Sequence, residues 1–207
     1  MTKESGYQQN LTAEEAHQRL IEGNRRFVAG QMLNAHQAAD WRAHLSSGQH
    51  PFATVLACSD SRVPPELVFD QGFGDIFIIR VAGNVLDSDV LGSISYALIH
   101  LKTPLVVIMG HERCGAVTAA LEVHDGADHE MRYIEGILDR IMPAIKQIDS
   151  RLPKEERLAA AVAENVHFVT NRLAEVIKSH KTLRSLPVEL KKAVYDLDTG
   201  VVNFLDE

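Results

Sequence analysis

Apolar residues along this chain fall into two kinds of pattern, short unbroken runs and longer stretches with helical spacing. The short runs at residues 52–57, 76–80 and 105–109 are typical of strands that are buried on both faces of a parallel sheet. The stretches at residues 131–148 and 154–178 have the length and spacing of helices. This alternation predicts an α/β fold, with a mainly parallel sheet flanked by helices.

The N-terminal region predicts a helix of its own. Thr12 and Glu15 have the spacing of a capping box, and the helix should end near Gly30. Its apolar positions are Leu20, Ile21, Phe27 and Val28. A lone arm should not expose so much apolar surface, so we expect a protruding helical arm that packs against a partner.

Turn and capping signals complete the predicted order of elements. Pro64-Pro65 favours a helix start, and Asp87 or Ser88 can cap a helix that carries Leu98 and Leu101. Near the C-terminus, residues 198–200 read Asp-Thr-Gly, a turn between two short strands. An antiparallel strand can therefore close one edge of the sheet.

The 207 residues form one predicted domain, since no linker divides them. Within it we distinguish an N-terminal arm (1–32), a core that carries the chemistry (50–115), and the C-terminal helices with a terminal hairpin (131–207).

Composition excludes several functions. A 45% apolar and 24% charged content is ordinary for a soluble domain. The formal net charge of −7 disfavours nucleic acid and anionic membranes as partners. No apolar run has the length of a membrane span. The polar N-terminus does not resemble a secretory signal, so we expect a cytoplasmic protein.

Two short motifs contain both cysteines of the chain. Residues 57–62 read Ala-Cys-Ser-Asp-Ser-Arg, and residues 110–115 read Gly-His-Glu-Arg-Cys-Gly. Cys58, His111 and Cys114 offer two thiolates and an imidazole, the donors that Zn²⁺ prefers. Both motifs follow predicted strands, and ligands bind at the C-terminal ends of strands in α/β sheets.

Other interpretations of the cysteines are weaker. They can be buried apolar residues or a disulfide, but a Cys-x-x-Cys redox pair is absent, and a closed structural zinc site usually takes four Cys or His ligands. Three strong ligands beside Asp60 suit a site with one open position. Asp60 and Arg62 can act as a fourth ligand or as a clamp on a reactive oxygen, or they can form a surface ion pair. Most of the other histidines lack ligand spacing, and we expect them at the surface.

Cys-x-Asp-x-Arg followed by His-x-x-Cys-Gly resembles the β-class carbonic anhydrases. The similarity extends to residues 20–28, 69–84 and 195–205. It implies one Zn²⁺ per chain, held by Cys58, His111 and Cys114 with water in the fourth position. The implied activity is the reversible hydration of CO₂ to bicarbonate and a proton, by attack of zinc-bound hydroxide on CO₂.

The resemblance also assigns roles to further residues. Asp60 should accept a hydrogen bond from the nucleophile while Arg62 holds its carboxylate, and Asp60 can become the fourth zinc ligand in a closed state. The positions that line the CO₂ pocket, in part from the partner subunit, are matched by Gln49, Phe77 and Tyr96. The position whose backbone N–H faces a bound anion is matched by Gly115. The assembly implied is a homodimer or a tetramer.

The residues are also compatible with two alternatives to CO₂ hydration. The same zinc hydroxide can attack COS or CS₂, and zinc can stabilise a scaffold or sensor without catalysis. The paired Asp60 and Arg62 argue against the scaffold, because a structural site does not need them.

One departure from the family concerns regulation. Some members bind a second, inhibitory bicarbonate through a Trp, whose position here is Val55, and an Arg, which Arg80 matches. Trp41 lies too far upstream to replace that Trp. We therefore expect no cooperative inhibition by bicarbonate.

Overall fold

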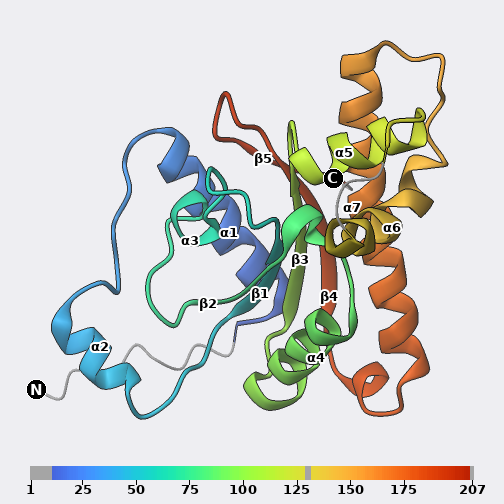
Figure 1. The fold of residues 1–207 in the computed structure, drawn as a ribbon. Helices are drawn as coiled ribbons and strands as arrows, with labels where there is room; N and C mark the ends of the chain where they lie inside the picture. The colour runs from blue at the N-terminus through green and yellow to red at the C-terminus, as the bar shows by residue number, and fades with distance from the viewer. Residues whose placement is uncertain (1–10, 129–131, 206–207) are drawn as a thin grey trace, which may run out of the picture.

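The computed structural model describes residues 11–128 and 132–205 (Figure 1). At its centre lies a five-stranded sheet with the strand order β2-β1-β3-β4-β5. All neighbouring strands are parallel except β4 and β5, which are antiparallel. The predicted sheet and its antiparallel edge strand are thus confirmed. The strands are β1 (Ala53–Ala57), β2 (Ile76–Arg80), β3 (Leu105–His111), β4 (Glu189–Tyr195) and β5 (Val202–Phe204).

Seven α-helices lie in the part of the chain that the structure describes. They are α1 (Ala13–Val28), α2 (Ala39–Leu45), α3 (Pro65–Val68), α4 (Ser88–Tyr96), α5 (Gly115–His124), α6 (Arg132–Ile145) and α7 (Lys154–Ser179). Short helical turns are η1 (Ala82–Asn84), η2 (Ala97–Leu101) and η3 (Leu183–Ser185). The start of the helix predicted at residues 131–148, Met131, lies outside the described residues, and neither α2 nor α5 was predicted. None of these helices combines the length and apolar character needed to cross a bilayer.

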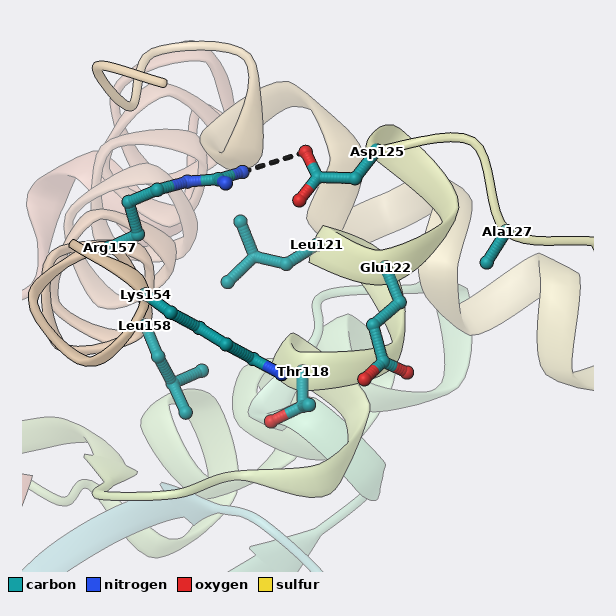
Figure 2. A pocket seen from close by; sticks show the side chains of 8 residues that line it. All are labelled: Thr118, Leu121, Glu122, Asp125, Ala127, Lys154, Arg157 and Leu158. Atoms are coloured by element: carbon teal, nitrogen blue, oxygen red, sulfur yellow. Dashed lines mark hydrogen bonds and ion pairs between the residues drawn. The ribbon is translucent and has the colours of Figure 1, made fainter. Parts of the chain in front are cut away.

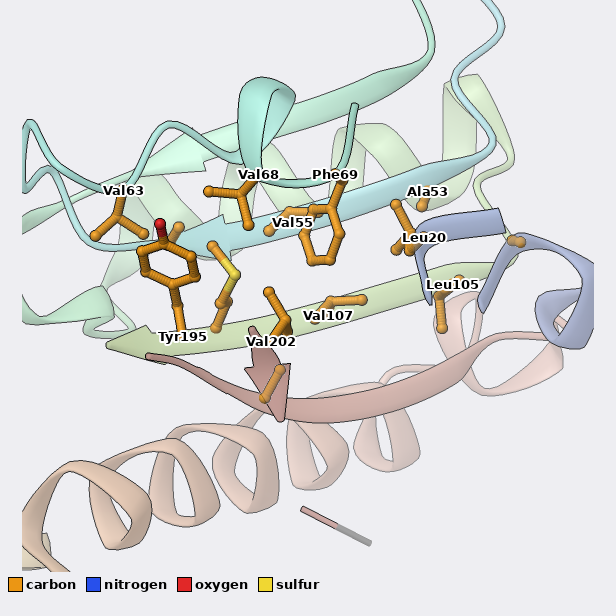
Figure 3. Packing of buried hydrophobic residues seen from close by; sticks show 14 of the residues in the cluster. Leu20, Ala53, Val55, Val63, Val68, Phe69, Leu105, Val107, Tyr195 and Val202 are labelled. Atoms are coloured by element: carbon orange, nitrogen blue, oxygen red, sulfur yellow. The ribbon is translucent and has the colours of Figure 1, made fainter. Parts of the chain in front are cut away.

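The two central strands are buried along their whole length. Every residue of β1 and β3 is buried, because both faces of the sheet are covered. Alternate side chains point to opposite faces: Val55 packs with Leu20 and Phe69 toward α1 and α3 (Figure 3), while Leu56 packs with Val166 toward α4 and α7. Burial on both sides explains why these strands appear as unbroken apolar runs.

The N-terminal helix forms as predicted but packs mainly on its own chain. The Thr12 hydroxyl accepts from the Glu15 N–H at 3.2 Å, and the Glu15 carboxylate accepts from the Thr12 N–H at 2.8 Å. Leu20 is completely buried in the core, whereas Val28 is 45% exposed. The apolar face that was expected to pack against a partner is therefore covered in large part by the chain's own sheet.

Polar contacts also fix α1 to the C-terminal hairpin. The buried Asn24 amide donates to the Gly200 carbonyl at 2.8 Å and accepts from the Val202 N–H at 2.9 Å. His17, on the same helix, is buried edge-on against Phe204 rather than at the surface. The segment that stands away from the body is α2, which has no buried residue (Figure 1).

Candidate metal centre

Parallel strand pairing brings the two sequence motifs together. Cys58 directly follows β1, and His111 is the last residue of β3, two residues beyond the predicted end of that strand. β1 and β3 are neighbours, with Ala57 opposite Met109, so their C-terminal ends share one edge. Cys114 comes after a short turn and immediately precedes α5. The fold therefore places all three residues at the ligand-binding edge of the sheet.

The three donor atoms form a compact, buried group. They lie within 4.8 Å of one another, and the two Sγ atoms are 4.0 Å apart. Two sulfurs bound to a tetrahedral ion at ~2.3 Å would be separated by ~3.8 Å. The observed spacing therefore suits a zinc ion without a large rearrangement.

The orientation of His111 also fits a metal ligand. Its Nδ1 donates to the main-chain oxygen of Glu112 at 2.8 Å, which fixes the tautomer and leaves a lone pair on Nε2. Nε2 is buried and has no hydrogen-bond partner among the described residues. An unsatisfied buried nitrogen is costly unless a ligand uses it. This nitrogen and the two sulfurs fit Zn²⁺ as the bound ion.

The two thiols differ in acidity because they are hydrogen-bonded to each other. Donation from Cys114, with further help from the Gly83 N–H, holds the pKa of Cys58 below the usual thiol range, although burial acts in the opposite direction. The same bond, together with burial, raises the pKa of Cys114. The pair thus readily gives up one proton, and an ion that binds both thiolates must displace the other.

Asp60 and Arg62 form a closed clamp beside the ligands. Arg62 Nε and Nη2 donate to Oδ1 and Oδ2 of Asp60 at 2.9 and 2.7 Å, and the Arg62 N–H donates to Oδ1 at 2.9 Å. These bonds hold the pKa of Asp60 well below its usual range. Asp60 Oδ2 lies 3.8 Å from His111 Nε2, so the carboxylate reaches the centre while still paired with Arg62.

An identical triplet elsewhere shows that this clamp is a local structure. Asp149-Ser150-Arg151 repeats the sequence Asp-Ser-Arg. Its Arg Nη2 also donates to Oδ2 at 2.7 Å, and its Arg N–H donates to Oδ1 at 3.0 Å. The second clamp lies in the turn between α6 and α7, where the Arg151 side chain is 87% exposed and the Asp149 side chain 43%. What distinguishes Asp60 is therefore its position beside the thiols.

The remaining predicted site residues are less closely placed. Gly115 begins α5 directly after Cys114, with open space where a Cβ would be. Phe77 pairs with Thr54 in the neighbouring strand. Thr54 precedes Cys58 by four residues, so Phe77 lies about 13 Å from the level of Cys58 along the strand. Its ring lies 6.3 Å from that of Tyr96, which is 48% exposed. Gln49 is exposed in the loop after α2.

Two residues that support the centre were not predicted in that role. Arg80, expected only as a match to an anion-binding Arg, donates from Nε to the Cys58 carbonyl at 3.0 Å and from Nη2 to the Asp60 carbonyl at 2.5 Å. The Gly83 N–H donates to Cys58 Sγ at 3.3 Å. The sequence pointed to these two residues only through residues 69–84, which include both and resemble the β-class carbonic anhydrases.

The turn between His111 and Cys114 is held by the C-terminal hairpin. Arg113 has a left-handed φ of 51°, and both terminal nitrogens donate to Asp198 at 2.8 Å. The Glu112 N–H donates to the Tyr195 carbonyl at 3.0 Å. Carboxylates of Glu112 and Asp198 also lie near Asp196, and Arg113 forms ion pairs with Glu112 and Asp198.

One surface pocket lies apart from the predicted ligands. Its volume is about 400 Å³, and it lies between α5 and α7 (Figure 2). Arg157 and Asp125 form an ion pair across one side at 2.7 Å. The residues that line it are Thr118, Leu121, Glu122, Asp125, Ala127, Lys154, Arg157 and Leu158, none of which was predicted to act in the site.

Comparison with known proteins identifies the family. The model of the carbonic anhydrase family matches residues 53–202, so the chain belongs to that family. Carbonic anhydrase 2 of Mycobacterium tuberculosis is 48% identical over 126 residues, and the match spans 61% of this chain and 61% of that relative.

Solved structures specify the class. The structure of the β-carbonic anhydrase CcaA has 27% identity and a TM-score of 0.71, with 91% of each chain covered. A tetrameric β-carbonic anhydrase of the filamentous ascomycete Sordaria macrospora has 25% identity and a TM-score of 0.71, covering 92% of this chain and 96% of that one. The chain is thus a carbonic anhydrase family member of the β class, as its motifs indicated.

The donor set generates a direct prediction about the metal. The purified protein should contain one Zn²⁺ per chain, and Cys58→Ser or Cys114→Ser should lose it, because a hydroxyl does not replace a thiolate donor. Elemental analysis after dialysis against a weak chelator measures the loss. Ser59→Ala, beside Cys58, should keep its zinc. A fully active protein without metal would contradict the assignment.

Proposed function

We propose that this chain is a zinc-dependent carbonic anhydrase that catalyses the reversible hydration of CO₂ to bicarbonate and a proton. The observation that carries the proposal is the Cys58–His111–Cys114 group with the Asp60–Arg62 clamp beside it. Membership of the carbonic anhydrase family supports the same reaction.

The chain's residues divide the work around the metal. Zn²⁺ held by Cys58, His111 and Cys114 would supply a Lewis acid that activates water at neutral pH. Asp60 accepts a hydrogen bond from the attacking water, and this bond directs the lone pair of the water oxygen toward CO₂. Because Arg62 keeps the Asp60 pKa low, the carboxylate stays ionised and only accepts hydrogen bonds. Asp60 therefore orients the nucleophile, and the reaction's proton leaves to solvent.

The product anion would be held at the start of α5. The helix has ten residues, and its N-terminal N–H groups carry partial positive charge. We assign to the Gly115 N–H a contact with the bicarbonate oxygen. The open space at the Gly115 Cβ position leaves room for that ligand.

The clamp also governs closure of the site. Asp60 can become a fourth metal ligand only if it leaves Arg62, which would break three hydrogen bonds. With the clamp intact, the position beside the ligands is available to water. We infer that the open arrangement is the working state at neutral pH and that acid favours closure, because the Asp60 carboxylate would then meet weaker competition for the metal.

No observation favours COS or CS₂ over CO₂ as the substrate. The non-catalytic scaffold remains disfavoured, since it gives no role to a clamp beside the ligands. CO₂ hydration and COS hydrolysis measured on one zinc-loaded sample separate the three functions. We expect CO₂ hydration to dominate, and the absence of both activities at full zinc occupancy would favour the scaffold.

A clamp variant should separate orientation from metal binding. Asp60→Asn should keep its zinc but lower kcat for CO₂ by roughly 10–100-fold, the usual loss when a group that supports a metal site is changed. Asp149→Asn is the matched control, because it alters the same triplet away from the centre. Stopped-flow assays from pH 7 to 9 give the comparison. Wild-type rates in Asp60→Asn at every pH would show that the assigned role is wrong.

We further propose that the chain assembles as a homodimer or a tetramer. The buried face of α1 supports this less than expected, but β2 is an edge strand whose Ile76, Phe77 and Ile78 are only half-buried. Exposed edges favour pairing with another chain. A partner across this edge would also complete a CO₂ pocket with Phe77, Tyr96 and Gln49.

The cytoplasmic location expected from the sequence stays a prediction.

Sedimentation velocity tests the assembly. We expect a dimer or a larger species that persists on dilution to concentrations at which activity is still measurable. Activity should fall when the species dissociates, because the partner is proposed to contribute to the pocket. A fully active monomer at dilute concentration would contradict this assembly.

The surroundings of Arg80 support the absence of a second bicarbonate site. Two of its guanidinium nitrogens donate to main-chain carbonyls, and Val55 is buried in β1 without a polar side chain. We therefore expect simple, non-sigmoidal inhibition when bicarbonate is titrated at fixed pH and ionic strength in the reverse reaction. Sigmoidal inhibition, or a crystal that shows an anion on Arg80 away from the metal, would overturn this expectation.

A further inference from the structure

A buried amide lies in the middle of the long helix α7. Asn165 is 1% exposed and belongs to the buried stripe of that helix, with Val162, Val166 and Val169. A polar group in such a position costs stability unless hydrogen bonds compensate. Asn165 Oδ1 has no hydrogen-bond partner among the described residues, so the compensation must come from the other end of the amide.

That end bonds to the turn that covers Cys58. Asn165 Nδ2 donates to the Gly83 carbonyl at 2.9 Å, and the Gly83 N–H donates to Cys58 Sγ at 3.3 Å. Both hydrogen bonds involve the main chain of Gly83. They connect a helix residue, through one glycine, to a ligand that is 107 positions away in the sequence.

The geometry of Gly83 shows that this turn is constrained. Its φ of +68° favours glycine, and an added Cβ would lie only 2.7 Å from Ile141 Cδ1 and 3.2 Å from Ala116 Cβ. The turn is thus enclosed by α6 and α5 while Asn165 holds its carbonyl from α7. Its N–H has little freedom to leave the sulfur.

We propose that Asn165 is a positioning residue that acts on the metal through Gly83 and Cys58. This role rests on the proposed zinc function. A hydrogen bond to a ligating sulfur withdraws electron density from it and tunes the metal. Two thiolates donate more charge than two imidazoles and would weaken the zinc ion as a Lewis acid. Asn165 offsets this effect by keeping the Gly83 N–H directed at Cys58.

Two substitutions and a matched control test the proposal in the full chain. Asn165→Leu removes the donor. Asn165→Ala also removes the donor, without adding bulk to the buried site, and it serves if the Leu variant does not fold. Thr170→Val is the control, because Thr170 is also buried on α7 but donates only to Val166 of the same helix.

Three measurements distinguish tuning from a merely structural role. Zinc affinity from competition with a chromophoric chelator should fall roughly tenfold in the Asn165 variants, the lower end of the range for such supporting residues. The sulfur-to-metal charge-transfer band of the cobalt-substituted protein should shift. The midpoint of the pH–rate profile for CO₂ hydration should rise. Thr170→Val should change none of the three, although it lowers the melting temperature.

A measurement on the wild-type protein does not depend on how the variants fold. In protein loaded with ¹¹³Cd²⁺, NMR should detect a coupling between the metal and the Gly83 amide proton through the sulfur. Its absence would overturn the proposal, as would Asn165 variants with wild-type zinc affinity, band and pH midpoint. A wild-type chain that binds no zinc would instead overturn the proposed function, and this role with it.

Discussion

The parallel pairing of β1 with β3 is the interaction on which the site depends. Cys58 and His111 meet because Ala57 lies opposite Met109, and a shift of one residue would turn the ligands toward opposite faces. Both strands are completely buried, so any shift in register would move apolar side chains out of two cores at once. Hydrophobic burial therefore sets the geometry of the metal ligands.

Around this frame, main-chain groups hold the ligands more than side chains do. The Glu112 carbonyl fixes the His111 ring, and the Gly83 N–H faces the Cys58 sulfur. Arg80 in turn holds two carbonyls of the loop that carries Cys58 and Asp60. Because each group is tied to a strand or a buried turn, the fold itself holds the three donor residues in place.

Residue type alone does not show which of two similar Asp-Arg clamps belongs to the metal site. Asp60 and Asp149 belong to identical Asp-Ser-Arg triplets with nearly identical hydrogen bonds. Only the first follows a strand that ends at the thiols. Local chemistry thus produces the clamp, and its place in the fold gives the clamp something to act on.

Elements with local signals could be predicted from the amino-acid sequence. Spacing and residue type were enough to predict the capping box at Thr12 and the apolar runs of β1, β2 and β3. The same signals identified the three ligand residues. Helix α5 was missed because its N-cap, Cys114, makes no capping bond. The contact of Asn165 with Gly83 spans 82 positions, and the burial of Leu20 on its own sheet is equally non-local. Such contacts leave no periodic signal in the sequence, because they form only when elements that are distant along the chain pack together in the folded protein.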